Sequence, residues 1–83
     1  MTYYSCPQKG VVICEAYCFR NFDDSLEVSK IIQVDYTTDK GSFEIKFVFK
    51  DDFQGDEESV IEDYFAPFGS GLLQKTCTVI YKK

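Results

Sequence analysis

The stretch Ser42–Lys50, SFEIKFVFK, decides the fold of this chain. Apolar residues recur in it at every second position, with charged residues between them: Phe43, Ile45, Phe47 and Phe49 against Glu44, Lys46 and Lys50. Successive side chains of a strand point to opposite faces, so this alternation predicts a strand with one apolar face and one mostly charged face. We expect the other elements to pack around this strand.

The preceding segment, Leu26–Thr37, alternates in the same way and predicts a second strand. A three-residue loop between the two strands would set polar side chains against apolar ones. A four-residue loop, Thr38–Gly41, sets apolar side chains opposite one another: Tyr36 and Phe43, Val34 and Ile45, Ile32 and Phe47. A slip of one residue would turn every side chain to the other face, so the buried face selects the four-residue loop. Gly41 would supply the left-handed position that ends it.

A further strand is predicted at Val11–Phe19, where β-branched and aromatic residues dominate, although Ile13, Ala16 and Tyr17 would also share a helical face. Face-matching with Leu26–Thr37 suggests cross-strand pairs between the two segments: Phe19 with Leu26, Tyr17 with Val28, and Glu15 with Lys30, where the two charges would neutralise each other. These three strands would form an antiparallel meander. Residues 1–10 are expected to be irregular or a weak edge strand, because Pro7 cannot donate to a ladder.

Asp56–Ala66 is the one convincing helix, because its apolar residues form a single stripe: Val60, Ile61, Tyr64 and Phe65. We expect Asp56 to cap its N-terminus and Pro67 to end it by pushing Ala66 out of helical geometry. Phe68–Gly71 is then expected to be a flexible connector. Lys75–Lys82 predicts a last strand at a sheet edge, beside the first or the third strand, with these residues on its inner side: Cys77, Val79 and Tyr81. The sequence therefore predicts an α+β fold in the order β-β-β-α-β, with the helix on one face of the sheet.

The length of 83 residues indicates a single domain over residues 1–83. The net charge of −5 argues against direct binding to nucleic acid and against adhesion to anionic membranes. The first residues show no basic region followed by an apolar run, and no apolar stretch approaches the roughly 20 residues that span a bilayer. We therefore expect no signal peptide and a cytoplasmic location.

The sequence contains no recognisable catalytic motif. The chain has no His, so a Ser–His or Cys–His nucleophile pair cannot be assembled, and no phosphate-binding glycine loop occurs. We expect a non-enzymatic protein without a cofactor or a metal. The sequence contains four cysteines without Cys-x-x-Cys spacing: Cys6, Cys14, Cys18 and Cys77. Three alternatives stay open for them: free thiols, of which Cys6 would be the most exposed; structural disulfides; and a metal site or a reactive thiol.

The sharpest feature is an acidic run that contains no Lys or Arg between Lys50 and Lys75. One interpretation is a solvated helix face with favourable charge at the helix N-terminus. The functional interpretation is a surface that docks on a basic partner, made by these residues: Asp52, Asp56, Glu57, Glu58, Glu62 and Asp63. A Ca²⁺ site is a third alternative, although the spacing of Asp51–Asp56 does not fit the twelve-residue calcium loop.

The leading hypothesis is a protein-binding module that inhibits by occlusion. Its partner would be a protein with a basic surface, plausibly part of a nucleic-acid-binding complex, and the class analogy is to phage or mobile-element anti-defence proteins such as anti-CRISPR or anti-restriction proteins. The alternative is a structural or regulatory subunit that associates by sheet-edge pairing, with a homodimer as its simplest form.

Overall fold

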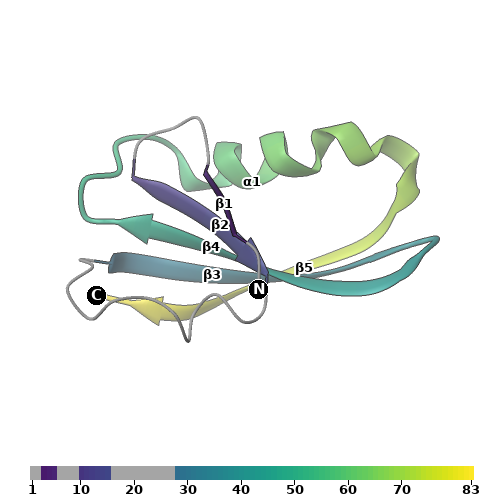
Figure 1. Ribbon diagram of the computed structural model, residues 1–83, viewed down its shortest axis with the longest axis horizontal. Helices are drawn as coiled ribbons and strands as arrows, with labels where there is room; N and C mark the ends of the chain where they lie inside the picture. The colour runs from purple at the N-terminus through teal and green to yellow at the C-terminus, as the bar shows by residue number, and fades with distance from the viewer. Residues whose placement is uncertain (1–2, 6–9, 16–27) are drawn as a thin grey trace.

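The computed structural model describes residues 3–5, 10–15 and 28–83, and Figure 1 shows the arrangement of their helices and strands. The elements follow one another in this order: β1 (Tyr3–Ser5), β2 (Val11–Glu15), β3 (Val28–Thr38), β4 (Gly41–Lys50), α1 (Glu57–Phe65), the 3-10 helix η2 (Ala66–Gly71) and β5 (Leu72–Lys82). The strands form one antiparallel sheet in the order β1-β2-β4-β3-β5, and α1 crosses one face of it. The predicted α+β class, the β-β-β-α-β order of the longer elements and the single helix on one face are confirmed.

The hairpin of β3 and β4 has the predicted register. Each predicted pair occurs: Tyr36 with Phe43, Val34 with Ile45 and Ile32 with Phe47. The same register sets Gln33 opposite Lys46 and Ile31 opposite Val48. The ladder continues through Thr38 and Gly41, so the turn itself is only Asp39 and Lys40. Gly41 has a φ of +127°, which confirms that the loop ends on a positive φ.

The predicted neighbour of β2 is wrong. β2 pairs with β4, with Ile13 opposite Phe47 and Glu15 opposite Ile45, and does not form a meander with β3. Glu15 therefore does not meet Lys30. The physical reason is burial: this pairing extends the apolar row of β4 under the helix with two further aliphatic side chains, those of Val11 and Ile13. The predicted pairs of Tyr17 and Phe19 lie outside the described residues, as does the predicted end of that strand.

The main core lies between the sheet and α1. Its buried residues come from alternate positions of three strands, β2, β3 and β4, and from the predicted helix stripe: Val11, Ile13, Ile32, Val34, Ile45, Phe47, Phe49, Val60, Ile61 and Phe65. Phe47 is 0% exposed and packs edge-on against the ring of Tyr64, with centroids 5.5 Å apart. Phe43, at the hairpin end, is 45% exposed and stacks on Tyr36. The apolar face predicted for β4 is therefore buried along all but its first position.

The opposite face of β4 is less charged and less exposed than predicted. Val48 is fully buried there and forms a second small cluster with Ile31, against which Val12 and Val28 pack. Lys46 is only 8% exposed, and its Nζ donates to Glu44 Oε2 at 2.8 Å. An ion pair of this kind keeps a nearly buried ammonium group partnered.

Pro67 does not break the helical path in the predicted way. Ala66 keeps right-handed helical dihedrals (φ −54°, ψ −43°), and the chain continues as η2 with Pro67 in its first turn. A proline lacks the N–H that the first helical turn leaves unpaired anyway, so it is compatible with a helix start. Phe68–Gly71 thus belongs to η2, which is kinked at Gly69 (φ +54°, ψ −131°), and β5 begins at Leu72, three residues before the predicted strand.

Candidate functional site

The predicted contact residues lie on α1 and on the segment before it. Asp56 caps the N-terminus of α1 as predicted, but its side chain accepts a hydrogen bond from the Ser59 hydroxyl at 2.8 Å, with no side-chain bond to a backbone N–H. Asp52 lies in the turn after β4, close to Gly10. Neighbouring Asp51, which was outside the predicted contact set, forms an ion pair with Lys83 at 2.7 Å.

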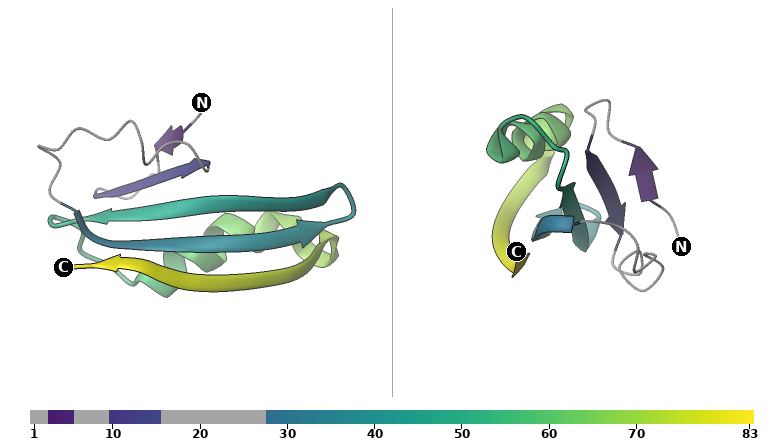
Figure 2. Two further views of the ribbon diagram at one scale, coloured as in Figure 1. Left: turned by 90° about the horizontal axis from the view of Figure 1, so that it is seen from below. Right: turned by 90° about the vertical axis from the view of Figure 1, so that its left-hand side faces the viewer.

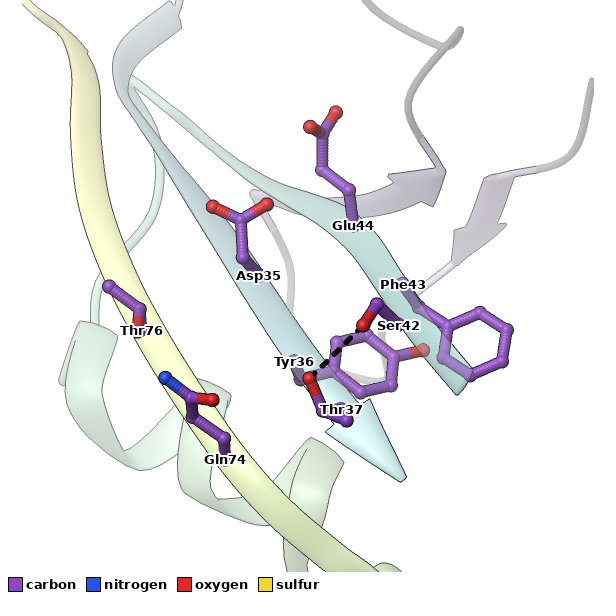
Figure 3. A pocket seen from close by; sticks show the side chains of 8 residues that line it. All are labelled: Asp35, Tyr36, Thr37, Ser42, Phe43, Glu44, Gln74 and Thr76. Atoms are coloured by element: carbon purple, nitrogen blue, oxygen red, sulfur yellow. Dashed lines mark hydrogen bonds between the residues drawn. The ribbon is translucent and has the colours of Figure 1, made fainter. Parts of the chain in front are cut away.

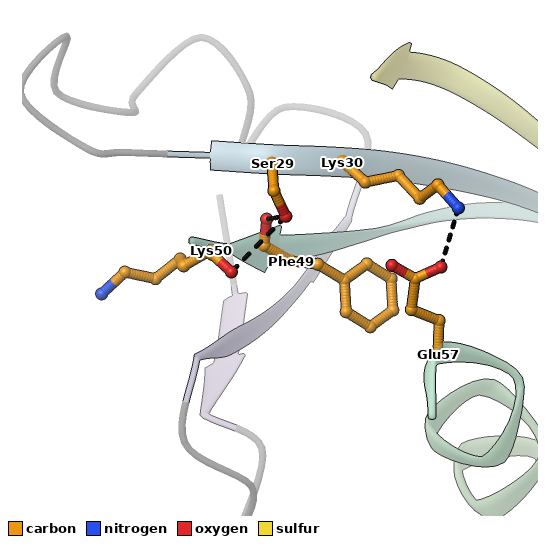
Figure 4. Close-up of polar contacts among 5 residues, drawn as sticks. All are labelled: Ser29, Lys30, Phe49, Lys50 and Glu57. Carbon is orange, nitrogen blue, oxygen red and sulfur yellow. Dashed lines mark hydrogen bonds and ion pairs between the residues drawn. The ribbon is translucent and has the colours of Figure 1, made fainter. Parts of the chain in front are cut away.

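Glu57 forms an ion pair within the fold. Lys30 Nζ donates to Glu57 Oε1 at 2.8 Å, and both side chains are partly buried (Figure 4). Lys30 lies on the helix side of β3, next to a register shift at which the Ser29 hydroxyl donates to the Phe49 carbonyl oxygen at 3.1 Å. This pair gives Lys30 a partner in the first turn of α1 in place of the predicted Glu15.

The ion pair between Lys30 and Glu57 should contribute modestly to stability. We expect Glu57→Gln to lower the free energy of unfolding by up to about 1 kcal/mol, because the pair is only partly shielded from water. Glu58→Gln is the matched control, since Glu58 also lies in the first turn of α1 and has no ion pair among the described residues. Urea unfolding followed by circular dichroism measures both, and equal midpoints for the two variants would contradict a stabilising pair.

The remaining helix carboxylates divide between two sides of α1. Glu62 Oε1 accepts a hydrogen bond from Lys75 Nζ of β5 at 3.2 Å, yet its side chain stays largely exposed. Glu58 lies one helical turn before Glu62, so the two share the side of α1 that faces β5. Asp63 is exposed and, at 100° per residue, lies away from that row. The structure therefore brings Glu58 and Glu62 together and separates Asp63 from them.

The outer strand β5 carries most of the large exposed hydrophobic residues in the described part of the chain. Apart from Phe43, these residues all belong to β5: Leu73, Val79, Ile80 and Tyr81. Val79 and Tyr81 were predicted on the inner side, and Cys77 is an exposed free thiol. The predicted edge position of β5 is confirmed, but β5 lies beside β3, the second predicted strand, and not beside the first or the third (Figure 2). Cys77 and Val79 pair with Val34 and Ile32 of the helix-facing row, yet both are exposed. The predictions of burial at these positions are therefore wrong.

A shallow hollow of about 380 Å³ lies on the face of the sheet opposite α1, at the turn end of the β3–β4 hairpin (Figure 3). It is lined by Asp35, Tyr36, Thr37, Ser42, Phe43, Glu44, Gln74 and Thr76. Asp35 and Glu44 are directly opposite each other across the two strands, and Thr37 shares a hydrogen bond with Ser42. Like charges in this position are unfavourable for pairing, and each carboxylate is engaged locally, Asp35 by Gln33 and Glu44 by Lys46.

Within the described ranges, no group of three or more potential ligands is arranged to hold a metal ion. Among the same residues, no helix has the length and apolar character needed to cross a bilayer. Of the cysteines, Cys6 and Cys18 lie outside the described residues, so the predicted alternatives for them stay predictions.

Comparisons with protein-family models, with curated proteins and with solved structures find no match to this chain.

Proposed function

We propose that this protein is a non-enzymatic binding module whose contact surface is the outer edge of β5 together with the β5-facing carboxylates of α1, Glu58 and Glu62. The observation that carries the proposal is the exposed edge strand: β5 has eleven residues, and its side chains are mostly exposed. An edge strand offers unpaired N–H and C=O groups to an extended segment of another protein.

Charge supports a basic partner for this edge. Glu62 reaches Lys75 of β5, Glu58 lies one helical turn earlier on the same side of α1, and the chain as a whole carries a net charge of −5. A partner strand with Lys or Arg would meet these carboxylates as it pairs with the backbone of β5. Such complementarity accelerates association and adds selectivity more than it adds raw affinity.

The narrower hypothesis is that the partner handles nucleic acid and that the protein acts in the cytoplasm as an anti-defence inhibitor of phage or mobile-element type. It rests on chain length and net charge alone. The edge-pairing surface and the acidic helix side do not require it.

We expect Glu58→Lys to reduce capture of partner proteins from a native cell extract. The immobilised protein should retain a set of basic proteins at low salt and release them as salt rises, because screening weakens exposed charge pairs beyond about 10 Å at 0.1 M. The retained proteins are identified after elution at graded salt. The double variant Glu58→Lys with Glu62→Lys should lose most of the set and flatten the salt dependence.

Asp63→Lys is the matched control, because it changes the net charge by the same amount on the same helix but away from β5. It should retain the same proteins as the unmodified chain. If all three variants capture the same set with the same salt profile, the electrostatic part of the proposal is wrong.

A further inference from the structure

We propose that Lys75 holds the place of an arginine side chain from a basic partner protein. Its ammonium group occupies a cation site formed by the Glu62 carboxylate and the ring of Phe65, and the guanidinium group of the partner displaces it. The inference deepens the proposed function and rests on it, since it assumes a basic partner at the side of α1 that faces β5. It does not require the partner to pair with the backbone of β5.

The first observation is that a cation already lies in this site. Lys75 Nζ donates to Glu62 Oε1 at 3.2 Å and lies 5.3 Å from the centroid of the Phe65 ring. An ammonium or guanidinium group within about 6 Å of the face of an aromatic ring is attracted by the ring. The site therefore combines a carboxylate with an aromatic ring, and both groups bind arginine side chains in proteins.

The second observation is that the carboxylate side of the site is open to solvent. The Glu62 side chain is 73% exposed, whereas the Lys75 side chain is 22% exposed. Phe65 is 4% exposed, so its ring is covered. An ion pair with one partner this exposed contributes little to stability. A partner can therefore reach Glu62 without unfolding the chain, and little stability is lost when Lys75 leaves it.

The third observation is a carboxylate that Lys75 does not use. Glu58 is exposed, lies one helical turn before Glu62 on the same side of α1, and forms no ion pair among the described residues. An ammonium group is a compact charge, whereas a guanidinium group carries five N–H donors in a planar fork and stacks on aromatic rings. The pair of carboxylates therefore suits an arginine better than the lysine that the site now holds.

A purely structural role for Lys75 predicts a different outcome. If Lys75 only ties β5 to α1, its removal leaves the affinity of the chain for cations unchanged or weakens it. If Lys75 competes with the partner, its removal frees Glu62 and strengthens binding. An internal competitor lowers the apparent affinity of a site in proportion to the fraction of molecules in which the site is occupied.

Binding of a dye-labelled hexa-arginine peptide, followed by fluorescence anisotropy at about 0.15 M NaCl, distinguishes the two roles. We expect Lys75→Gln to lower the Kd of the peptide about threefold to fivefold, the effect of one exposed charge pair. Lys82→Gln is the matched control, because it removes one lysine from the same strand but at the end that pairs with Lys30. It should change the Kd by less than about twofold.

The Glu62→Gln background shows whether the gain arises in the site. Lys75→Gln frees no carboxylate there, so its effect on the Kd should vanish. An equal gain in both backgrounds, or an equal gain from Lys82→Gln, would show that net charge alone is responsible and would overturn the inference. Unchanged, weaker or unmeasurable binding by the Lys75→Gln chain, with thermal unfolding showing that it is folded, would overturn it as well.

Capture from a native cell extract separates this inference from the proposed function. The Lys75→Gln chain should retain the same basic proteins as the unmodified chain, but up to a higher salt concentration. If Glu58→Lys reduces capture while Lys75→Gln leaves the salt profile unchanged, the proposed function stands and the displacement of Lys75 is wrong. If neither substitution changes capture, both are wrong.

Discussion

Replacing Phe47 by alanine should remove about 3–5 kcal/mol from the free energy of unfolding, the largest effect of any single substitution proposed here. The ring is 0% exposed at the centre of the sheet and contacts the rings of Tyr64 and Phe65 on α1. A domain of this length has a total stability of roughly 4–12 kcal/mol, so the variant should be largely unfolded at room temperature or melt far below the parent chain. Urea unfolding followed by far-ultraviolet circular dichroism measures the difference.

Phe43→Ala is the matched control for this substitution. Phe43 lies on the same face of the same strand, but it is 45% exposed and its main ring contact is the stacked ring of Tyr36, 5.4 Å away. Its loss should cost about 1 kcal/mol, in line with an exposed aromatic pair. Similar costs for the two substitutions would show that the core is not centred between β4 and α1.

Gly10→Ala should lower the free energy of unfolding by about 3 kcal/mol, because both backbone strain and a steric clash would arise at this residue. Gly10 has a φ of +89°, which an L side chain adopts only with strain, and a Cβ built on it would lie 2.7 Å from the Cα of Phe53. The backbone cannot easily move away, since the Gly10 carbonyl oxygen accepts a hydrogen bond from the Lys50 N–H at 2.7 Å. This close approach joins the start of β2 to the end of β4.

Two other glycines separate the effect of backbone strain from that of the steric clash. Gly41 has a positive φ but nothing within 4 Å of an added Cβ, so Gly41→Ala should show the conformational cost alone, about 1–2 kcal/mol. Gly71 has neither feature, and Gly71→Ala should change stability by less than about 0.5 kcal/mol. Chemical denaturation of the three variants should rank them in this order, and a Gly10 variant no less stable than the Gly41 variant would contradict the close contact with Phe53.

The sequence predicted the β3–β4 hairpin and the helix α1, but not the 3-10 helix η2. The alternation around Phe47 predicted the exact face of β4, and matching it against Val34 and Ile32 predicted the register of the hairpin. The order of strands was not predictable in the same way. The apolar side chains of β2 could pack beside either β3 or β4. The prediction placed β2 beside the strand that follows it in the sequence, which is β3. Burial beside Phe47 under α1 decided the outcome.

The candidate site was predictable only in part. The acidic composition of α1 follows directly from the sequence, but the partners of its carboxylates do not, because Lys30 and Lys75 reach Glu57 and Glu62 from two different strands. The exposure of Val79 was missed for a related reason. Alternation shows which residues of a strand share a face, whereas the exposure of that face depends on how far the helix covers it, and the core under α1 does not include Val79.

The two-residue turn between β3 and β4 has a kinetic consequence. Closing such a short loop requires little chain entropy, whereas β2 and β5 must each join the hairpin across tens of intervening residues. The hairpin can therefore form early and act as the template on which the distant segments assemble. Folding speed should then be limited by the slow search of these remote segments, as is typical of chains with many contacts between residues far apart in sequence.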